Sequence, residues 1–163
     1  MKKRAKILIV LVVASILLFA VLNVFFPHDG YFYSFEQCEN NYKKSLTDGK
    51  LVLKIDTDDA IFEVWINKGN EIYVSKTAPK ETLFGTKYKV SFSKGYSIEK
   101  ALQYYQQTGT GLWINAPEIN TDIHSNVLSW SICGKDYKNA TDKYATITYS
   151  GGEFLFLYDL KEP

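Results

Sequence analysis

One group of residues in this 163-residue chain has the types and spacing that acid–base catalysis uses. His124 is flanked by Asp122 and Ser125 in a polar stretch, and an imidazole close to a carboxylate can transfer protons near neutral pH. Catalytic partners normally converge from separate elements, however, and the chain contains no G-x-S-x-G nucleophile motif. His124 and Asp122 are therefore weak candidate acid–base residues, and a surface loop is the default interpretation.

Two further motifs match catalytic or metal-binding patterns only in part. Ser97 and Lys100 form an S-x-x-K pair, but the S-D-N and K-T-G partners of that serine chemistry are absent, so Ser97 is better explained as a helix cap. The run from Asp56 to Asp59 resembles the start of a calcium loop, but Ile61 occupies the position where glycine is required. We therefore expect no metal, no cofactor and no enzymatic activity.

The aromatic content is the least ordinary feature of the composition. Aromatic residues make up 15% of the chain and include 12 tyrosines. Most must be core residues, but four lie in predicted loops or on the polar side of a predicted helix, where exposed rings favour protein interfaces or sugar stacking. These four form the candidate binding surface: Trp113, Tyr96, Tyr104 and Tyr137.

An uncharged apolar segment precedes all the residues described so far. Residues 7–26 contain sixteen Val, Ile, Leu or Phe residues, and a helix of this length spans about 30 Å, the thickness of a bilayer core. Residues 1–6 are basic, which places the N-terminus in the cytoplasm. The sequence thus predicts an uncleaved, single-pass type II signal anchor in the cytoplasmic membrane. A cleaved signal peptide is the alternative, although bulky residues at 22–27 disfavour cleavage.

The rest of the chain forms one predicted domain outside the cytoplasm, either periplasmic or at the cell surface. A short linker covers residues 27–33 and the domain covers 34–163. Beyond residue 26 the net charge is −3, and Arg4 is the only arginine in the chain, which argues against nucleic-acid binding. Cys38 and Cys133 would both be exported, so we expect one disulfide that stabilises the domain by about 4 kcal/mol. Two buried thiols are the alternative.

Hydrophobic periodicity predicts how the domain is built. Residues 35–46 and 98–108 have apolar positions at helical spacing. The remaining segments alternate between apolar and polar residues and are joined by short turns, which is typical of antiparallel strands. We therefore expect an α+β fold with two short helices on a mainly antiparallel sheet of about seven strands. The candidate strand segments, of which 112–115 is a short one, are 50–56, 60–67, 71–76, 86–93, 112–115, 127–133, 144–149 and 153–159.

Three functions are compatible with these features. The first is an envelope interaction domain that binds a protein partner in an accessory, inhibitor or immunity role. The second is a small carbohydrate- or cell-wall-binding module that uses the exposed aromatic residues. The third is a small hydrolase centred on His124. They differ in what they require: a contiguous apolar patch, a groove lined by rings, or a pocket that joins His124 to an acid or hydroxyl.

Overall fold

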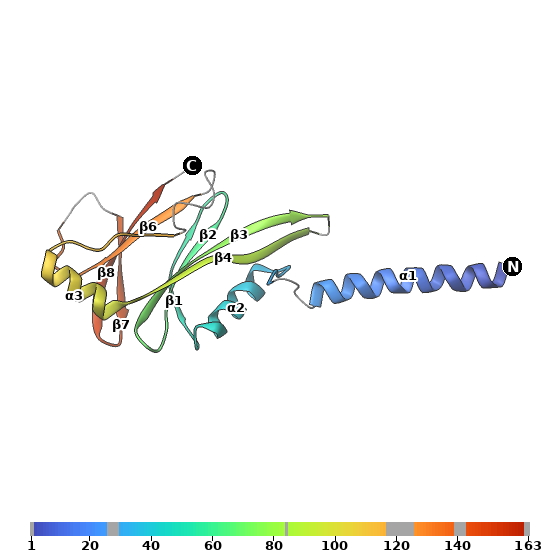
Figure 1. Cartoon of the computed structure of the whole chain (residues 1–163), viewed down its shortest axis with the longest axis horizontal. Helices are drawn as coiled ribbons and strands as arrows, with labels where there is room; N and C mark the ends of the chain where they lie inside the picture. Colours follow the sequence, from blue (N-terminus) through green and yellow to red (C-terminus); the bar gives the residue numbers. More distant parts are fainter. Residues whose placement is uncertain (1, 26–29, 84, 117–125, 139–142, 162–163) are drawn as a thin grey trace.

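The computed structural model describes residues 2–25, 30–83, 85–116, 126–138 and 143–161. These residues form an α+β fold with three helices and two antiparallel four-stranded sheets (Figure 1). Sheet A has the order β1-β2-β3-β4 and sheet B the order β5-β6-β8-β7. Sheet A consists of β1 (Lys50–Asp56), β2 (Ile61–Ile66), β3 (Glu71–Thr82) and β4 (Gly85–Ser97), and sheet B of β5 (Ile114–Ala116), β6 (Val127–Cys133), β7 (Lys143–Tyr149) and β8 (Gly152–Lys161).

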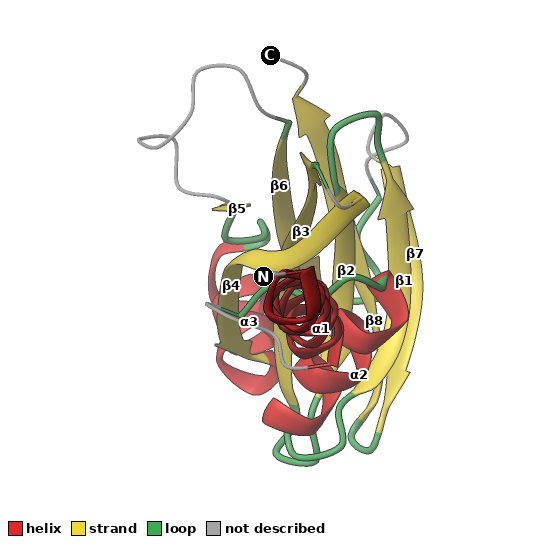
Figure 2. Ribbon diagram, turned by 90° about the vertical axis from the view of Figure 1, so that its right-hand side faces the viewer, coloured by secondary structure: helices red, strands yellow, loops and turns green. Residues whose placement is uncertain are grey.

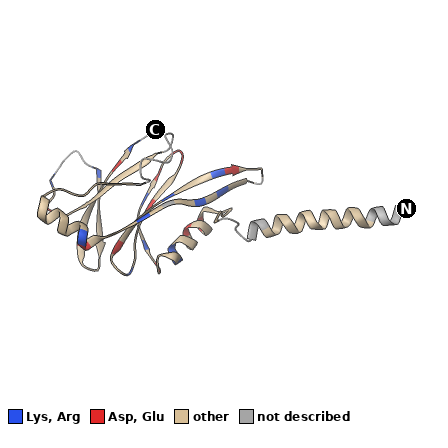
Figure 3. Ribbon diagram, in the orientation of Figure 1, with Lys and Arg blue, Asp and Glu red and all other residues tan. Residues whose placement is uncertain are grey.

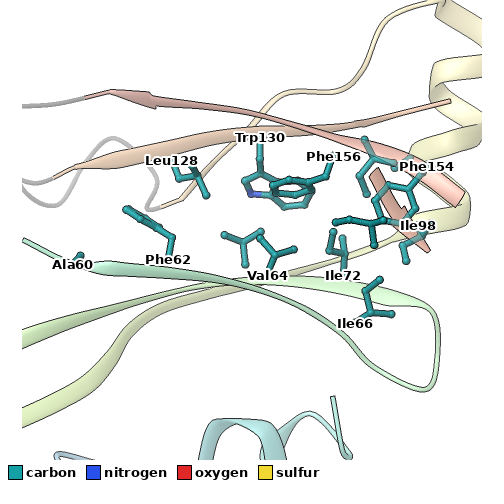
Figure 4. Close-up of a cluster of buried hydrophobic side chains, with 14 residues drawn as sticks. Ala60, Phe62, Val64, Ile66, Ile72, Ile98, Leu128, Trp130, Phe154 and Phe156 are labelled. Atoms are coloured by element: carbon teal, nitrogen blue, oxygen red, sulfur yellow. The ribbon is translucent and has the colours of Figure 1, made fainter. Parts of the chain in front are cut away.

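The two sheets pack face to face around one apolar core. Figure 2 shows their strands running in roughly the same direction, and Figure 4 shows the side chains that meet between them. Phe62 and Val64 of β2 face Trp130 of β6 and Phe156 of β8, and all four are buried. The Trp130 and Phe156 rings stack with their centroids 5.6 Å apart. Residues that alternate along each strand therefore supply this core, as expected for a half-buried strand.

The helices occupy different places around the two sheets. Helix α2 (Phe35–Ser45) packs on the outer face of sheet A, where Tyr42 and Leu46 contact Trp65. Helix α3 (Ile98–Thr108) follows β4 and contacts β6 of sheet B. The backbone N–H of Lys100 donates to the Ser97 hydroxyl, so the cap interpretation of Ser97 is confirmed. Helix α1 (Lys2–Phe25) extends away from the sheets.

The structure corrects the predicted architecture in two respects. The strands form two packed sheets, whereas the sequence predicted a single sheet of about seven strands. In the part of the chain that the structure describes, no helix is long and apolar enough to cross a membrane. This finding contradicts the predicted anchor over residues 7–26, together with the type II topology and the envelope location derived from it.

The predicted disulfide is also wrong. Cys38 and Cys133 are both buried, and no disulfide joins them. Cys38 lies on α2, against the outer face of sheet A, whereas Cys133 ends β6 and packs with Tyr105 on the far side of sheet B. The core of the sandwich separates the two thiols, and a disulfide requires Cα atoms within about 7 Å.

A buried polar cluster joins the two sheets at one end of the core. Lys76 of β3 is only 4% exposed, and its ammonium group donates at 2.9 Å to the backbone carbonyl of Asn126, just before β6 of sheet B. The Asp59 carboxylate lies 3.7 Å from Lys76 Nζ and accepts from the backbone N–H of Asn126 at 3.1 Å. Burial tends to raise the pKa of Asp59, but hydrogen bonds from Asn126 and Thr57, with the Lys76 charge, hold it below the usual value of 3.8.

The Asp59→Asn substitution should destabilise the full chain at pH 7 by about 1–3 kcal/mol, because it leaves the buried Lys76 charge without a carboxylate. The lowered pKa means that the stabilisation from Asp59 is present above pH 3.8 and is lost as the pH falls through the folded-state value. Urea unfolding should therefore show that the wild type and the variant converge at acid pH. Asp58→Asn in the same turn is the control and should change little. Equal stability of Asp59→Asn and wild type at pH 7 would refute this role for the cluster.

Candidate functional site

The four predicted binding aromatics lie in different environments. Tyr96 packs against the core between the sheets, and Tyr137 packs edge-on against Tyr105, with ring centroids 6.2 Å apart. Tyr104 is 38% exposed on α3, and Trp113 is 45% exposed just before β5. The structure therefore does not bring the four rings into one surface. The candidate acid–base residues, His124 and Asp122, lie outside the described residues.

Trp113 borders an open groove of about 480 Å³ on sheet B. A volume of this size is within the range of small-molecule binding sites. The groove is lined by residues from all four strands of the sheet and by the segment that leads into β5. These residues are Trp113, Asn115, Ser129, Lys143, Tyr158, Asp159 and Lys161.

Three polar side chains form a row across the groove. In the strand register Asn115 of β5 lies opposite Ser129 of β6, and Ser129 lies opposite Asp159 of β8. Neighbouring strands are about 4.8 Å apart, so this row extends for about 10 Å. The Ser129 hydroxyl donates to the Asn115 side-chain carbonyl at 2.7 Å, which orients the amide and leaves its N–H groups available. Asp159 is exposed and adds a carboxylate to the row.

The core determines why these polar residues face outward. Ile114 packs against the core, and so do Leu128 and Trp130 on either side of Ser129. Because successive side chains in a strand point to opposite faces, the residues between these core positions must lie on the outer face of sheet B. The chain before Trp113 also approaches the sheet closely at Gly111, where a Cβ atom would collide with Ser131. This close approach places the Trp113 ring beside the row.

Sequence reasoning found Trp113 but missed the polar residues beside it. Asn115, Ser129 and Asp159 come from three segments far apart in the chain, and each resembles an ordinary solvent-facing strand residue. The sequence signal that could have indicated them was their position next to core residues, because neighbouring residues in a strand point to opposite faces of the sheet. What was missing was the pairing of β5 with β6 and of β6 with β8, which brings the three together.

A second unusual group lies beneath α2 and is closed to solvent. Glu63 of β2 is 1% exposed, and neither of its carboxylate oxygens accepts a well-formed hydrogen bond from a described residue. Burial is the main reason that its pKa is raised from 4.5 to about 7. The charge of Glu39 adds to this shift, whereas Lys54 and the nearby Trp65 indole oppose it. Burial likewise raises the pKa of the neighbouring Cys38 thiol. Since no groove reaches Glu63 among the described residues, we regard it as a titratable structural group.

No group of three or more His, Cys, Asp and Glu residues among the described positions could hold a metal ion. Compared with known proteins, the chain matches no family model, no curated protein and no solved structure. The geometry of the Trp113 groove is therefore the main guide to function.

The Glu63→Gln substitution should make the stability of the chain less dependent on pH. Glu63 binds its proton more tightly in the folded state than in the unfolded state, so its contribution is complete below pH 4.5 and is lost as the pH rises to about 7. A shift of this size corresponds to about 3 kcal/mol. Urea unfolding should show the variant and the wild type nearly equal at pH 4.5, with the variant more stable at pH 8.

Glu99→Gln is the matched control, because Glu99 is an exposed carboxylate on α3. It should leave the pH dependence of the wild type unchanged. If Glu63→Gln showed the same loss of stability between pH 4.5 and pH 8 as the wild type, the carboxyl would not be the titrating group.

Proposed function

We propose that this chain is a carbohydrate-binding domain whose ligand occupies the Trp113 groove. The observation that carries the proposal is the exposed Trp113 ring beside the polar row of Asn115, Ser129 and Asp159. A pyranose ring has an apolar face of C–H groups and a rim of hydroxyls. A flat aromatic ring complements that face, while amide and carboxylate groups exchange hydrogen bonds with the hydroxyls.

The mixed lining of the groove supports this ligand class. A strongly apolar ligand would leave the Asp159 carboxylate and the two lysines of the groove poorly solvated, which is costly. A polyol keeps these groups hydrogen-bonded while Trp113 loses its exposed surface. Because the groove is open, we expect modest affinities, with Kd between about 1 µM and 1 mM.

The other two hypotheses have less support from the described residues. A protein-binding surface would present a contiguous apolar patch. Helix α1 exposes apolar side chains from Ile7 to Leu22, but in the rest of the described chain the large exposed apolar side chains are Leu83, Tyr104, Trp113 and Tyr144, which belong to different elements. Leu83 lies at the turn between β3 and β4, and Tyr104 lies on α3. For a hydrolase, the candidate residues His124 and Asp122 lie outside the described residues.

The Trp113→Ala substitution should weaken binding of any oligosaccharide that the wild type retains by at least about 30-fold, because a central aromatic contact typically contributes 2 kcal/mol or more. The wild-type chain would first be screened on an oligosaccharide array, and affinities for the best ligand would then be measured by titration calorimetry.

Tyr104→Ala removes an aromatic side chain of similar exposure that does not line the groove, so it serves as the matched control. The proposal predicts that this variant binds like the wild type. It would be rejected if the wild type bound no oligosaccharide on the array, or if Trp113→Ala and Tyr104→Ala had the same effect.

A further inference from the structure

A second groove lies on the same sheet as the first. It has a volume of about 440 Å³ and is bordered by β7, β8 and the segment that follows β6. Tyr144, which is 59% exposed, lines it and supplies a second accessible ring. Its lining residues are Lys135, Tyr137, Lys138, Tyr144, Thr146, Glu153 and Leu155.

Most lining residues of the two grooves lie on the outer face of sheet B, whereas Lys143 of the edge strand β7 pairs with Tyr158 and has the inward parity. On β8, Phe154 and Phe156 point into the core, so Glu153, Leu155 and Asp159 all point outward. Leu155 lines the second groove, and Asp159, four residues further along the same strand, lines the first. At about 3.3 Å per residue these two positions are about 13 Å apart.

In the strand register, Tyr144 lies between the polar residues of the first groove and those of the second. It pairs with Leu157 of β8, which is the outward position between Leu155 and Asp159. Its exposed ring is therefore placed to contact a ligand that extends from one groove toward the other. A monosaccharide would fill only one groove, whereas an extended chain of several sugars matches the distance between them.

The charge of the two grooves differs from that of the whole chain. Over the chain, 19 basic residues nearly balance 18 acidic ones, and Figure 3 shows both signs spread along the molecule. Each groove, by contrast, contains two lysines and one carboxylate. In the second groove Lys135 forms an ion pair with Glu153, which lowers the pKa of that carboxyl and leaves Lys138 as the additional cation. Lys143 and Lys161 of the first groove form no ion pair with another described residue.

We propose that the ligand is an anionic polysaccharide chain, with carboxylate or other acidic groups, that occupies both grooves and contacts Trp113 and Tyr144. This inference rests on the proposed function and adds the ligand's charge and minimum length. The lysines supply positive charge to both ends of the site, and the rings supply stacking surfaces. Single-stranded nucleic acid also combines stacking bases with negative charge, but the only arginine, Arg4, lies outside both grooves.

The experiment compares four probes with the full chain by titration calorimetry in low salt. They are oligogalacturonates of two and of eight residues, the fully methyl-esterified octamer, and an eight-nucleotide single-stranded DNA. The methyl ester keeps the length of the chain but removes its charge. We expect the charged octamer to bind at least about tenfold more tightly than each of the other three probes, and to weaken as salt is added.

Lys138→Gln tests the second groove separately. It should weaken binding of the octamer severalfold, by removing one attractive charge at an exposed site, and should weaken binding of the dimer less, because the dimer does not need both grooves. Lys44→Gln is the matched control, because Lys44 is an exposed lysine of α2, the helix that packs on the other sheet. Equal binding of the dimer and the octamer, or no effect of Lys138→Gln, would overturn the two-groove site.

The remaining outcomes separate this inference from the proposed function. If the methyl-esterified octamer bound as tightly as the charged one and Trp113→Ala abolished both interactions, the preference for anionic chains would be refuted while the carbohydrate-binding function stood. Tighter binding of the DNA than of the charged octamer would refute the ligand class. If no saccharide bound, both proposals would fail.

Discussion

The packing of two sheets against one shared core is the constraint on which the rest of this structure depends. Phe62 and Val64 on one sheet and Trp130 and Phe156 on the other must all face inward. Because a strand alternates its side chains, these positions decide which residues appear on the two outer faces. A shift of one residue in β6 would place Ser129 in the core and Trp130 in solvent. The polar row of the groove is therefore a consequence of core packing as well as of local sequence.

The two outer faces differ in their exposure to solvent because the helices cover them differently. Helix α2 lies on sheet A, where it buries Glu63 and Trp65 beneath it together with its own Cys38. On sheet B, helix α3 covers the region around Cys133 and Leu155, while Trp113 and Tyr144 remain accessible. Polar groups on the first face are dehydrated, which raises the pKa of Glu63. On the second face Ser129 and Ser131 are also buried, whereas Asp159 is exposed and can exchange its hydration for a ligand's hydroxyl groups.

Local patterns in the sequence predicted local structure well. The spacing of apolar residues indicated α2 and α3, and Ser97 was identified as a cap. The predicted strands 71–76 and 86–93 left Pro79 outside the sheet, yet β3 and β4 continue past it, with Pro79 opposite Tyr88. Strand β2 begins at Ile61, opposite Thr77, so one edge of β3 is unpaired by β2 beyond that point, and a proline that lacks an N–H is tolerated there.

Properties that depend on distant segments were predicted poorly. The disulfide was inferred from the number of cysteines and from the expected export of the domain, but Cys38 and Cys133 lie on opposite sides of the sandwich. Composition could not show that β8 inserts between β6 and β7. That insertion is what places Asp159 beside Ser129 and completes the groove. The exposure of Trp113 was predicted, whereas its polar neighbours could be found only from the strand pairing.

The central claim, that the outer face of sheet B binds saccharide, is tested most directly by an NMR titration of the isotope-labelled full chain with oligogalacturonate. We predict that the largest shifts occur at the Trp113 indole N–H and at the backbone amides of Asn115, Ser129 and Asp159, with little change on α2. Shifts confined to α2 or to the β3–β4 turn, or the absence of any shift at saturating ligand, would contradict the account.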